Sequence, residues 1–205
     1  MSRDLHKKRI KRTLTIRGQI QRDRILVVAT YLFWRKGYLG TSIQDIVDEA
    51  NINKSNIYYY FKNKADILYQ ISLRTYEGVI NVALSVMNSD SSPTKKLEEF
   101  IHGHIKWVLS NQVLAQLDSN DRRNLTPKLL NNVIESRDKY SSLFRKTVED
   151  AMAHANSQVM DPKLASLFIL SLMNSITLWY KPNAGLTPKE IASQVYSFVS
   201  NALHC

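Results

Sequence analysis

Four of the five prolines in this chain directly follow a residue whose side chain commonly caps a helix N-terminus. The four pairs are Ser92-Pro93, Thr126-Pro127, Asp161-Pro162 and Thr187-Pro188. Proline suits the first helical position because the N–H that it lacks would have no partner there, while the preceding side-chain oxygen accepts from an amide of the first turn. Each pair therefore predicts the start of a helix.

Between these starts, apolar residues recur at intervals of three and four, the period of a helix with one buried face. Leu97, Phe100, Ile101 and Val108 follow this spacing, and no segment shows the alternation of a β-strand. The fifth proline, Pro182, indicates a helix end. We predict an all-α protein with helices near residues 20–36, 42–50, 54–61, 64–88, 93–117, 127–155, 162–180 and 188–203.

Composition excludes several other classes. Hydrophobic residues make up 44% of the 205 residues, which is enough for a packed core. The single cysteine, Cys205, cannot form an internal disulfide or a thiolate zinc site, which favours a cytoplasmic protein. The first 25 residues lack the apolar segment of a signal peptide. The most apolar stretch, 164–180, is shorter than the ~20 residues that span a bilayer, so we expect a buried helix there and no membrane partner.

Positive charge is concentrated at the N-terminal end. Residues 1–36 hold 11 Lys and Arg against two Asp, whereas residues 37–205 hold 17 basic and 16 acidic residues. Nearly all of the formal charge of +10 therefore lies in this first segment. Such a segment attracts a polyphosphate backbone, from which it displaces counterions. Charge alone also fits a solvated tail with an anionic membrane surface as a weak partner.

Two short predicted helices follow a longer one near the N-terminus. The first helix ends at Gly37, and the second begins at Thr41 with Gln44 in the capping-box position. Residues 51–53 separate it from a third helix, which begins at Lys54. Two short helices joined by a three-residue turn describe a helix-turn-helix, a motif that places its second helix in the major groove of DNA.

The predicted helix at 54–61 has one apolar and one polar face. Ile57, Tyr60 and Phe61 share the apolar face, while Ser55, Tyr59 and Lys62 point the opposite way with Tyr58 beside them. Successive helical positions point about 100° apart, so three consecutive tyrosines cannot all face one core. An exposed tyrosine near lysines favours a surface partner, since its hydroxyl can donate to phosphate.

The run from Arg24 to Leu68 closely resembles the N-terminal DNA-binding domain of TetR-type bacterial transcriptional repressors. The resemblance rests on Gly37-Tyr38, Thr41-Ser42, Ile46, the run KSNIYYYF at 54–61, and Lys64. Two positions depart from the family pattern: Asn51 stands where Gly is usual, and Tyr60 where His is common. Asparagine tolerates left-handed backbone angles, so the first departure costs little. The second leaves the packing beneath the helix open.

The resemblance implies roles for individual residues. In such repressors the positions of Lys54, Ser55 and Asn56 approach bases, and those of Thr41, Ser42, Tyr58, Tyr59 and Lys64 hold phosphates. Gln44 and Lys62 complete the candidate DNA-binding set. The implied partner is a double-stranded, palindromic operator bound by a dimer, and the implied activity is repression that a small-molecule inducer relieves.

Residues 64–205 carry 15 basic and 13 acidic side chains, which does not suggest a second nucleic-acid surface. In the resembled family the last two helices pair with a second subunit in a four-helix bundle, and here these are 162–180 and 188–203. The helix at 162–180 is apolar nearly all round, which requires partners on every side. The centre of a monomeric bundle would also supply them. We favour a homodimer, because two recognition helices roughly 34 Å apart read a palindrome more tightly than one.

Two polar residues lie on apolar stripes and are candidates for a ligand site. Arg137 should point toward the core, where a guanidinium needs an internal acid, such as Asp118, Asp121 or Glu98, or an anionic ligand. His104 fits either a hydrogen-bonded core histidine or a ligand contact. Other residues that fit an apolar cavity, or simply the core, are Trp107, Tyr140, Phe144, Met173 and Trp179.

A second, less specific resemblance concerns the ligand. Residues 125–151 and 179–203 look like the ligand domain of TetR-type repressors that answer to acyl-CoA thioesters in lipid, sterol or aromatic-acid breakdown. The resemblance implies an apolar tunnel with basic residues at its mouth, drawn from Arg122, Arg123, Arg137, Arg145 and Lys146. The alternative is a TetR-type regulator of an efflux gene that senses cationic or hydrophobic drugs.

Catalysis finds little support in the sequence. His102 and His104 point about 200° apart on a helix, which is wrong for joint metal ligation, and no phosphate loop or nucleophile elbow occurs. We therefore expect no enzyme, metal site or cofactor other than the inducer. A helical protein-interaction module is disfavoured by the helix-turn-helix spacing. The expected organisation is a basic arm at 1–19, a DNA-binding domain at 20–66, and a ligand-binding and dimerisation domain at 67–205.

Overall fold

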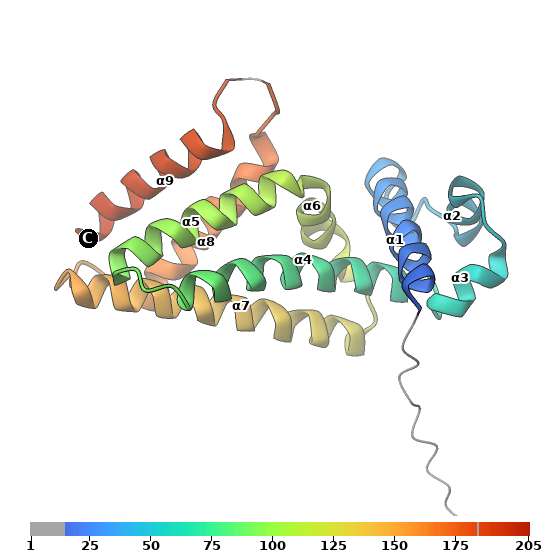
Figure 1. The fold of residues 1–205 in the computed structure, drawn as a ribbon, viewed down its shortest axis with the longest axis horizontal. Coiled ribbons are helices and arrows are strands. Elements are labelled where there is room, and N and C mark those ends of the chain that lie inside the picture. Colours follow the sequence, from blue (N-terminus) through green and yellow to red (C-terminus); the bar gives the residue numbers. More distant parts are fainter. Residues whose placement is uncertain (1–14, 184) are drawn as a thin grey trace, which may run out of the picture.

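The computed structural model describes residues 15–183 and 185–205. Within these ranges the chain forms α-helices and one short 3-10 helix, and no strand, so the prediction of an all-α protein is confirmed. The helices, shown in Figure 1, are α1 (Ile16–Lys36), α2 (Ile43–Ala50), α3 (Lys54–Tyr60), α4 (Lys64–Met87), α5 (Pro93–Ser110), α6 (Gln112–Asp121), η1 (Arg122–Asn124), α7 (Pro127–His154), α8 (Pro162–Trp179) and α9 (Pro188–Leu203).

The four helix starts predicted from proline are confirmed, because α5, α7, α8 and α9 each begin at a proline. The side chains of Ser92, Asp161 and Thr187 each accept a hydrogen bond from an amide of the first turn, whereas Thr126 makes no such bond. Thr187 and Glu190 also form the expected capping box. Local capping chemistry thus set these boundaries.

Two predicted boundaries are wrong. Helix α1 starts at Ile16 rather than near 20, because the Thr15 hydroxyl accepts from the Gly18 amide, so residues 16–19 do not belong to an arm. Residues 1–14 of the predicted arm lie outside the described residues. The helix expected at 93–117 breaks at Asn111, whose backbone (φ −126°, ψ 36°) separates α5 from α6.

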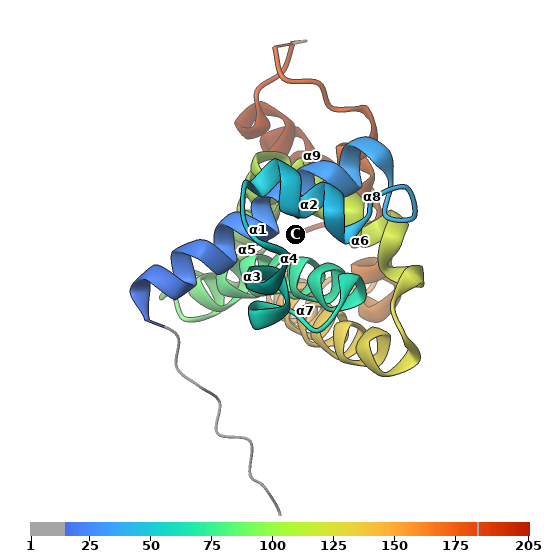
Figure 2. The same cartoon turned by 90° about the vertical axis from the view of Figure 1, so that its right-hand side faces the viewer.

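The described helices form two parts. Helices α1–α3 pack together at one end, and the long α4 runs from them into the bundle made by α5–α9 (Figure 1). Viewed from the α1–α3 end in Figure 2, α2 and α3 lie toward the viewer, in front of the bundle. The core is continuous between the parts, because α4 buries Ile67 and Leu68 near its start and Val79 and Ala83 further along.

Helix α6 connects the two parts directly. It packs against α1 and α4, and two of its side chains also bind the C-terminal end of α8. The Gln112 amide donates to the carbonyls of Thr177 (2.7 Å) and Tyr180 (3.1 Å), and the Gln116 amide donates to the same Thr177 carbonyl (2.7 Å). Both glutamines thus satisfy backbone groups that a helix end leaves free.

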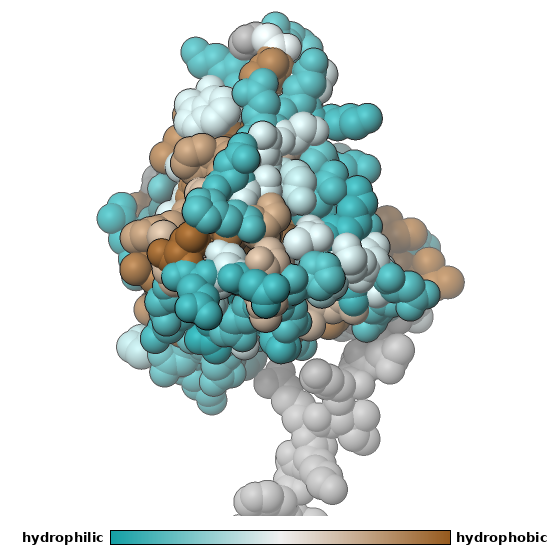
Figure 3. All heavy atoms as spheres, turned by 90° about the vertical axis from the view of Figure 1, so that its left-hand side faces the viewer, coloured by the Kyte–Doolittle hydropathy of each residue, from teal (hydrophilic) through white to brown (hydrophobic). Residues whose placement is uncertain are grey.

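Helices α8 and α9 leave a broad apolar face uncovered. The residues exposed on this face, here called the α8–α9 face, include Leu164, Phe168, Leu172 and Phe198. Figure 3, which looks at the end of the molecule away from α1–α3, shows hydrophobic residues gathered on its left flank amid a largely hydrophilic surface. In the part of the chain that is described, no helix is long and apolar enough to cross a membrane.

Candidate nucleic-acid interface and ligand cavity

Helix α3 presents nearly all of its side chains to solvent. Ile57 is buried beneath it, whereas Lys54, Ser55 and Asn56 are exposed, as is Lys62 just beyond its end. Tyr58 and Tyr59 are 52% and 58% exposed, and the Tyr59 ring meets the half-buried Tyr60 edge-to-face at 4.8 Å. The helix therefore offers amide, hydroxyl and ammonium groups that are able to bind a partner.

The start of α2 differs from the prediction. Ser42, not Thr41, caps the helix, and Asp45, not Gln44, completes the capping box. Lys36 binds Asp45 at 2.6 Å, and this bond together with the Ser42 contacts lowers the pKa of that carboxyl well below its usual range. Gln44 is exposed and donates to Asp48, so its side chain stays on the outer surface of α2.

Thr41 does not serve the expected phosphate contact. Its side chain is 1% exposed, and its hydroxyl lies within hydrogen-bond distance of the carbonyls of Leu32 (3.2 Å) and Gly37 (2.9 Å). The hydroxyl therefore stabilises the turn between α1 and α2. Ser42 next to it is exposed, so of this pair it alone presents its side chain to the surface.

Lys64 is likewise used inside the fold. Its ammonium group donates to the carbonyls of Tyr38 (2.9 Å) and Thr41 (2.7 Å) and lies 4.4 Å from the centroid of the Tyr38 ring. These contacts hold the α1–α2 turn against the start of α4. In this structure Lys64 therefore positions the α1–α2 turn, and its phosphate contact stays a prediction.

Asn51 shows why the departure from glycine is tolerated. Its backbone is left-handed (φ 48°, ψ 57°), and its N–H bonds the carbonyls of Asp48 and Val47 at the end of α2. Asparagine adopts this conformation more readily than other residues with a Cβ. The turn between α2 and α3 is therefore formed without glycine.

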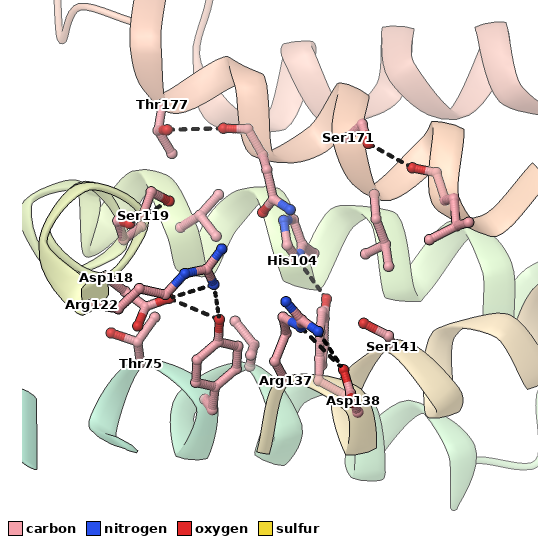
Figure 4. Close-up of a pocket in the computed structure, with 18 residues that line it drawn as sticks. Thr75, His104, Asp118, Ser119, Arg122, Arg137, Asp138, Ser141, Ser171 and Thr177 are labelled. Atoms are coloured by element: carbon pink, nitrogen blue, oxygen red, sulfur yellow. Dashed lines mark hydrogen bonds and ion pairs between the residues drawn. The ribbon is translucent and has the colours of Figure 1, made fainter. Parts of the chain in front are cut away.

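A cavity of about 510 Å³ lies between α4, α5, α6, α7 and α8 (Figure 4). This volume falls within the range of small-molecule sites in proteins. Its lining residues are Thr75, Tyr76, Val79, His104, Val108, Ala115, Asp118, Ser119, Arg122, Arg137, Asp138, Tyr140, Ser141, Leu167, Leu170, Ser171, Asn174 and Thr177. Every helix of the larger part except α9 contributes to it.

One wall of the cavity carries a buried carboxylate. The Tyr76 hydroxyl donates to Asp118 at 2.8 Å, and Arg122 lies 3.7 Å from the same carboxylate oxygen. Burial raises the pKa of Asp118, while Tyr76, Ser72 and Arg122 oppose the increase. Burial, followed by the charge of Asp118, also raises the pKa of Tyr76. The hydrogen bond between Asp118 on α6 and Tyr76 on α4 thus joins these two helices at the cavity wall.

The lining of the cavity also holds a neutral histidine. His104 Nδ1 lies 2.5 Å from the Tyr140 hydroxyl, and both side chains are buried. Burial lowers the pKa of His104 to about 4, an effect that the nearby Asn174 side chain partly opposes. His104 Nε2 has no partner in hydrogen-bond geometry. The imidazole is therefore uncharged near pH 7 and keeps one polar atom unused.

Arg137 does not enter the core as predicted. Its side chain is 43% exposed and binds the adjacent Asp138 (2.9 Å) at the cavity rim, rather than Asp118, Asp121 or Glu98. The long side chain extends from an apolar stripe toward water, so no buried partner is required. Figure 4 shows Arg137 and Arg122 projecting into the same region from α7 and from the end of α6.

Four other predicted ligand residues do not line this cavity. Phe144 and Met173 are fully buried, and Phe144 packs on Phe100 at 4.8 Å between ring centroids. The Trp107 indole covers Gly78, where a Cβ would lie 2.2 Å from the ring. Trp179 is 57% exposed at the end of α8. The first three belong to the core, and Trp179 belongs to the surface.

Sequence reasoning missed Tyr76, Asn174 and the cavity role of Asp118. Tyr76 follows the apolar period of α4, and Asn174 is one of several small polar residues in its stretch, beside Ser171, Ser175 and Thr177, so neither stands out. Among the described residues, no group of three or more His, Cys, Asp and Glu side chains is placed to hold a metal ion.

A helix-turn-helix with an exposed second helix, joined to a helical bundle with a cavity, is the architecture expected of a DNA-binding regulator. Residues 25–71 match the family described as bacterial regulatory proteins, tetR family, and residues 90–203 match the tetracyclin repressor-like C-terminal domain. The chain therefore belongs to the TetR family of transcriptional regulators.

Individual relatives agree with this assignment. The HTH-type transcriptional repressor KstR2 of Mycolicibacterium smegmatis is 20% identical over 87% of this chain and 88% of its own length. A tetR-family regulatory protein from Rhodococcus RHA1 has a TM-score of 0.83 at 22% identity, covering 90% of this chain and 97% of that structure. AibR, solved with isovaleryl coenzyme A and operator DNA, has a TM-score of 0.78 at 22% identity, covering 89% and 98%.

Proposed function

We propose that this protein is a cytoplasmic repressor that binds a palindromic operator through α3. The observation that carries this proposal is the exposure of Lys54, Ser55 and Asn56 at the start of a helix whose remaining surface presents Tyr58 and Tyr59. Lysine and amide groups can bond base edges in the major groove, and tyrosine hydroxyls can bond phosphates. Ser42, Gln44 and Lys62 extend the same contact surface.

The functional unit of the proposal is a homodimer formed through the α8–α9 face. Phe168, Leu172 and Phe198 are each more than a third exposed in the single chain, and a contiguous apolar surface of this kind marks an association site. A two-fold axis through it would place two copies of α3 on the same DNA.

A ligand in the cavity supplies the proposed control. Asp118 and Arg122 at the end of α6 line the cavity, and the neighbouring Asp121 is close enough to Tyr38 to help burial raise the pKa of that phenol. A ligand that moves α6 would therefore act on the α1–α2 turn. It changes DNA affinity only to the extent that it binds the two arrangements differently.

The ligand proposed first is an acyl-CoA thioester. Supporting this proposal, AibR shares the fold and was solved with isovaleryl coenzyme A. A regulator of an efflux gene that senses a cationic drug remains the second candidate, for which the buried Asp118 would supply a counter-charge. Either ligand could bind in the cavity and act on the α1–α2 turn through α6.

The proposal is tested by gel shift on the protein's own promoter region, with and without ligand. Operator binding that saturates at two chains per palindrome, and that acyl-CoA thioesters weaken, is the expected result. No preference for any promoter fragment over random DNA would contradict the operator assignment. Release by cationic dyes, with no response to any thioester, would favour the efflux regulator.

A further inference from the structure

The lining of the cavity combines apolar and polar side chains. Its apolar residues are Val79, Val108, Ala115, Leu167 and Leu170, and most of the other side chains carry a hydroxyl, amide or charge. The hydroxyls of Thr75, Ser119, Ser171 and Thr177 each donate to a carbonyl of their own helix, so they need no partner from a ligand. The lining therefore offers a ligand apolar contact together with a small number of polar groups.

The charges around the cavity are balanced in pairs. Arg122 lies 3.7 Å from Asp118, and Arg137 lies 2.9 Å from Asp138. His104 is neutral near pH 7 because it is buried. A charged ligand would find no unpaired buried charge of opposite sign in this lining, so the lining favours an uncharged ligand.

Two buried atoms of the lining lack a hydrogen-bond partner. They are Asp118 Oδ1 and His104 Nε2, which belong to side chains on different helices, α6 and α5. The Ser72 hydroxyl lies close enough to Asp118 to lower its pKa, and the Asn174 side chain lies close enough to His104 to raise its pKa, but neither reaches hydrogen-bond geometry. The carboxylate oxygen requires a donor, and the neutral imidazole nitrogen accepts or donates according to its tautomer. A hydroxyl group satisfies either atom.

We propose that the cavity takes a compact, uncharged skeleton that carries hydroxyl groups, with one hydroxyl on Asp118 and another on His104. The inference deepens the proposed ligand response and rests on it. The small apolar patch formed by Leu167, Leu170 and Val108 contacts the body of the skeleton. The hydroxylated group can arrive as a free molecule or as the acyl part of a CoA thioester whose nucleotide stays outside.

The test is direct binding to the full-length protein without DNA, by calorimetry and thermal shift. The probe is 4,4′-dihydroxybiphenyl, and its size-matched controls are 4,4′-dimethylbiphenyl, biphenyl-4,4′-dicarboxylate and the bis(aminomethyl) analogue. The dihydroxy probe should bind at least about tenfold more tightly than each control, because only it carries neutral hydroxyl groups that can bond these atoms. Equal or tighter binding of any control would overturn the inference.

A second pair of probes distinguishes the two sources of the hydroxylated group. If the group arrives free, the dihydroxy probe binds and 4-hydroxybenzoyl-CoA does not; if it arrives as a thioester, 4-hydroxybenzoyl-CoA binds and octanoyl-CoA does not. Preference for octanoyl-CoA, or no binding by either hydroxylated probe, contradicts the inference.

Two variants assign the contacts, and a third is their control. Asp118→Asn and His104→Gln should each weaken the hydroxylated probe roughly tenfold, since each alters one polar contact. Glu149→Gln, an exposed side chain paired with Arg145 on α7, should leave binding unchanged. Circular dichroism confirms that each variant is folded. Unchanged binding in both cavity variants would overturn the inference.

The same probes separate this inference from the proposed function. Binding of the dihydroxy probe that never alters operator affinity would support the chemistry of the cavity and contradict the ligand response. Release of the operator by octanoyl-CoA, with no binding of a hydroxylated probe, would support the ligand response and contradict the inferred ligand class.

Discussion

The ammonium group of Lys64 lies over the ring of Tyr38 and donates a hydrogen bond to the Tyr38 carbonyl at 2.9 Å. Tyr38 follows α1, and Lys64 begins α4, so this contact joins the helix-turn-helix to the helix that runs into the bundle. A lysine beside a recognition helix is easily taken for a phosphate contact. Here it fixes the orientation of the motif.

Replacing Lys64 by methionine should therefore lower the stability of the folded protein. The variant leaves two carbonyls without their donor, and we expect the free energy of unfolding to fall by about 1 to 3 kcal/mol in urea titrations. Lys62→Met, an exposed neighbour with the same charge change, is the control and should stay within about 0.5 kcal/mol of the parent. Equal effects of the two variants would contradict the positioning role.

Lys54→Ala should weaken binding to the operator more than binding to random DNA. A good base contact contributes about 1 to 3 kcal/mol of discrimination, so the ratio of the two dissociation constants should drop at least several-fold. Fluorescence anisotropy at fixed salt measures both constants. Lys139→Ala, exposed on α7, removes the same charge far from the motif and should leave the ratio unaltered. If the ratio of the two dissociation constants is unchanged in Lys54→Ala, then Lys54 contacts no base.

Stability should fall in mild acid because of His104. Its pKa is about 4 in the folded protein against 6.5 ordinarily, so between these values the unfolded chain binds more protons. The stabilisation is complete above pH 6.5 and is lost as the pH falls toward 4. At pH 5 the free energy of unfolding should have fallen by about 2 kcal/mol. Urea unfolding at pH 7.5 and 5 should show this loss in the parent and in His154→Gln, but much less of it in His104→Gln.

Phe198→Glu should dissociate the proposed dimer. Two copies of the side chain leave the interface, each with about 2 kcal/mol of burial, so the dimer dissociation constant should rise by roughly two to three orders of magnitude. Analytical ultracentrifugation measures the change. Val27→Glu, an equally exposed apolar residue on α1, is the matched control. A protein that sediments as a dimer with glutamate at 198 would place the interface elsewhere.

Deletion of residues 1–14 should reduce DNA affinity without changing operator preference. The segment carries six basic and one acidic side chain, and each phosphate contact contributes about 0.9 to the slope of log K against log salt. The deletion keeps Thr15, which caps α1, so folding should be preserved. A shallower slope with the same operator preference is expected. Loss of preference at an unchanged slope would make the arm a specific reader.

Capping chemistry made most helix boundaries predictable, because it depends on a few adjacent residues. The break at Asn111 was not predictable in this way: the apolar spacing continues through it, and the neighbouring Gln112 is held by carbonyls 65 and 68 residues away. The prediction that α2 begins at Thr41 was wrong for a related reason. Either Thr41 or Ser42 could cap α2, and only the buried turn decides which hydroxyl faces inward.

The candidate DNA contacts on α3 depend on helical direction alone, so the sequence predicted the exposure of Tyr58 and Tyr59. The cavity depends on five helices meeting, and periodicity shows only that a residue faces inward. It does not distinguish Phe144, which fills the core, from Tyr140, which borders an opening. Arg137 lay on an inward stripe, yet its length let the charge reach water at the rim.

The two glutamines that bind the end of α8 have a thermodynamic consequence for the assembly. Gln112 and Gln116 attach α6, which carries Asp118, to α8, which would form part of the subunit interface. A movement of α6 would therefore displace the end of α8. Binding free energies are reciprocal: if ligand occupancy changes the association of subunits, then association changes ligand affinity by the same factor. The protein's own concentration would then help to set how much inducer is needed to free the operator.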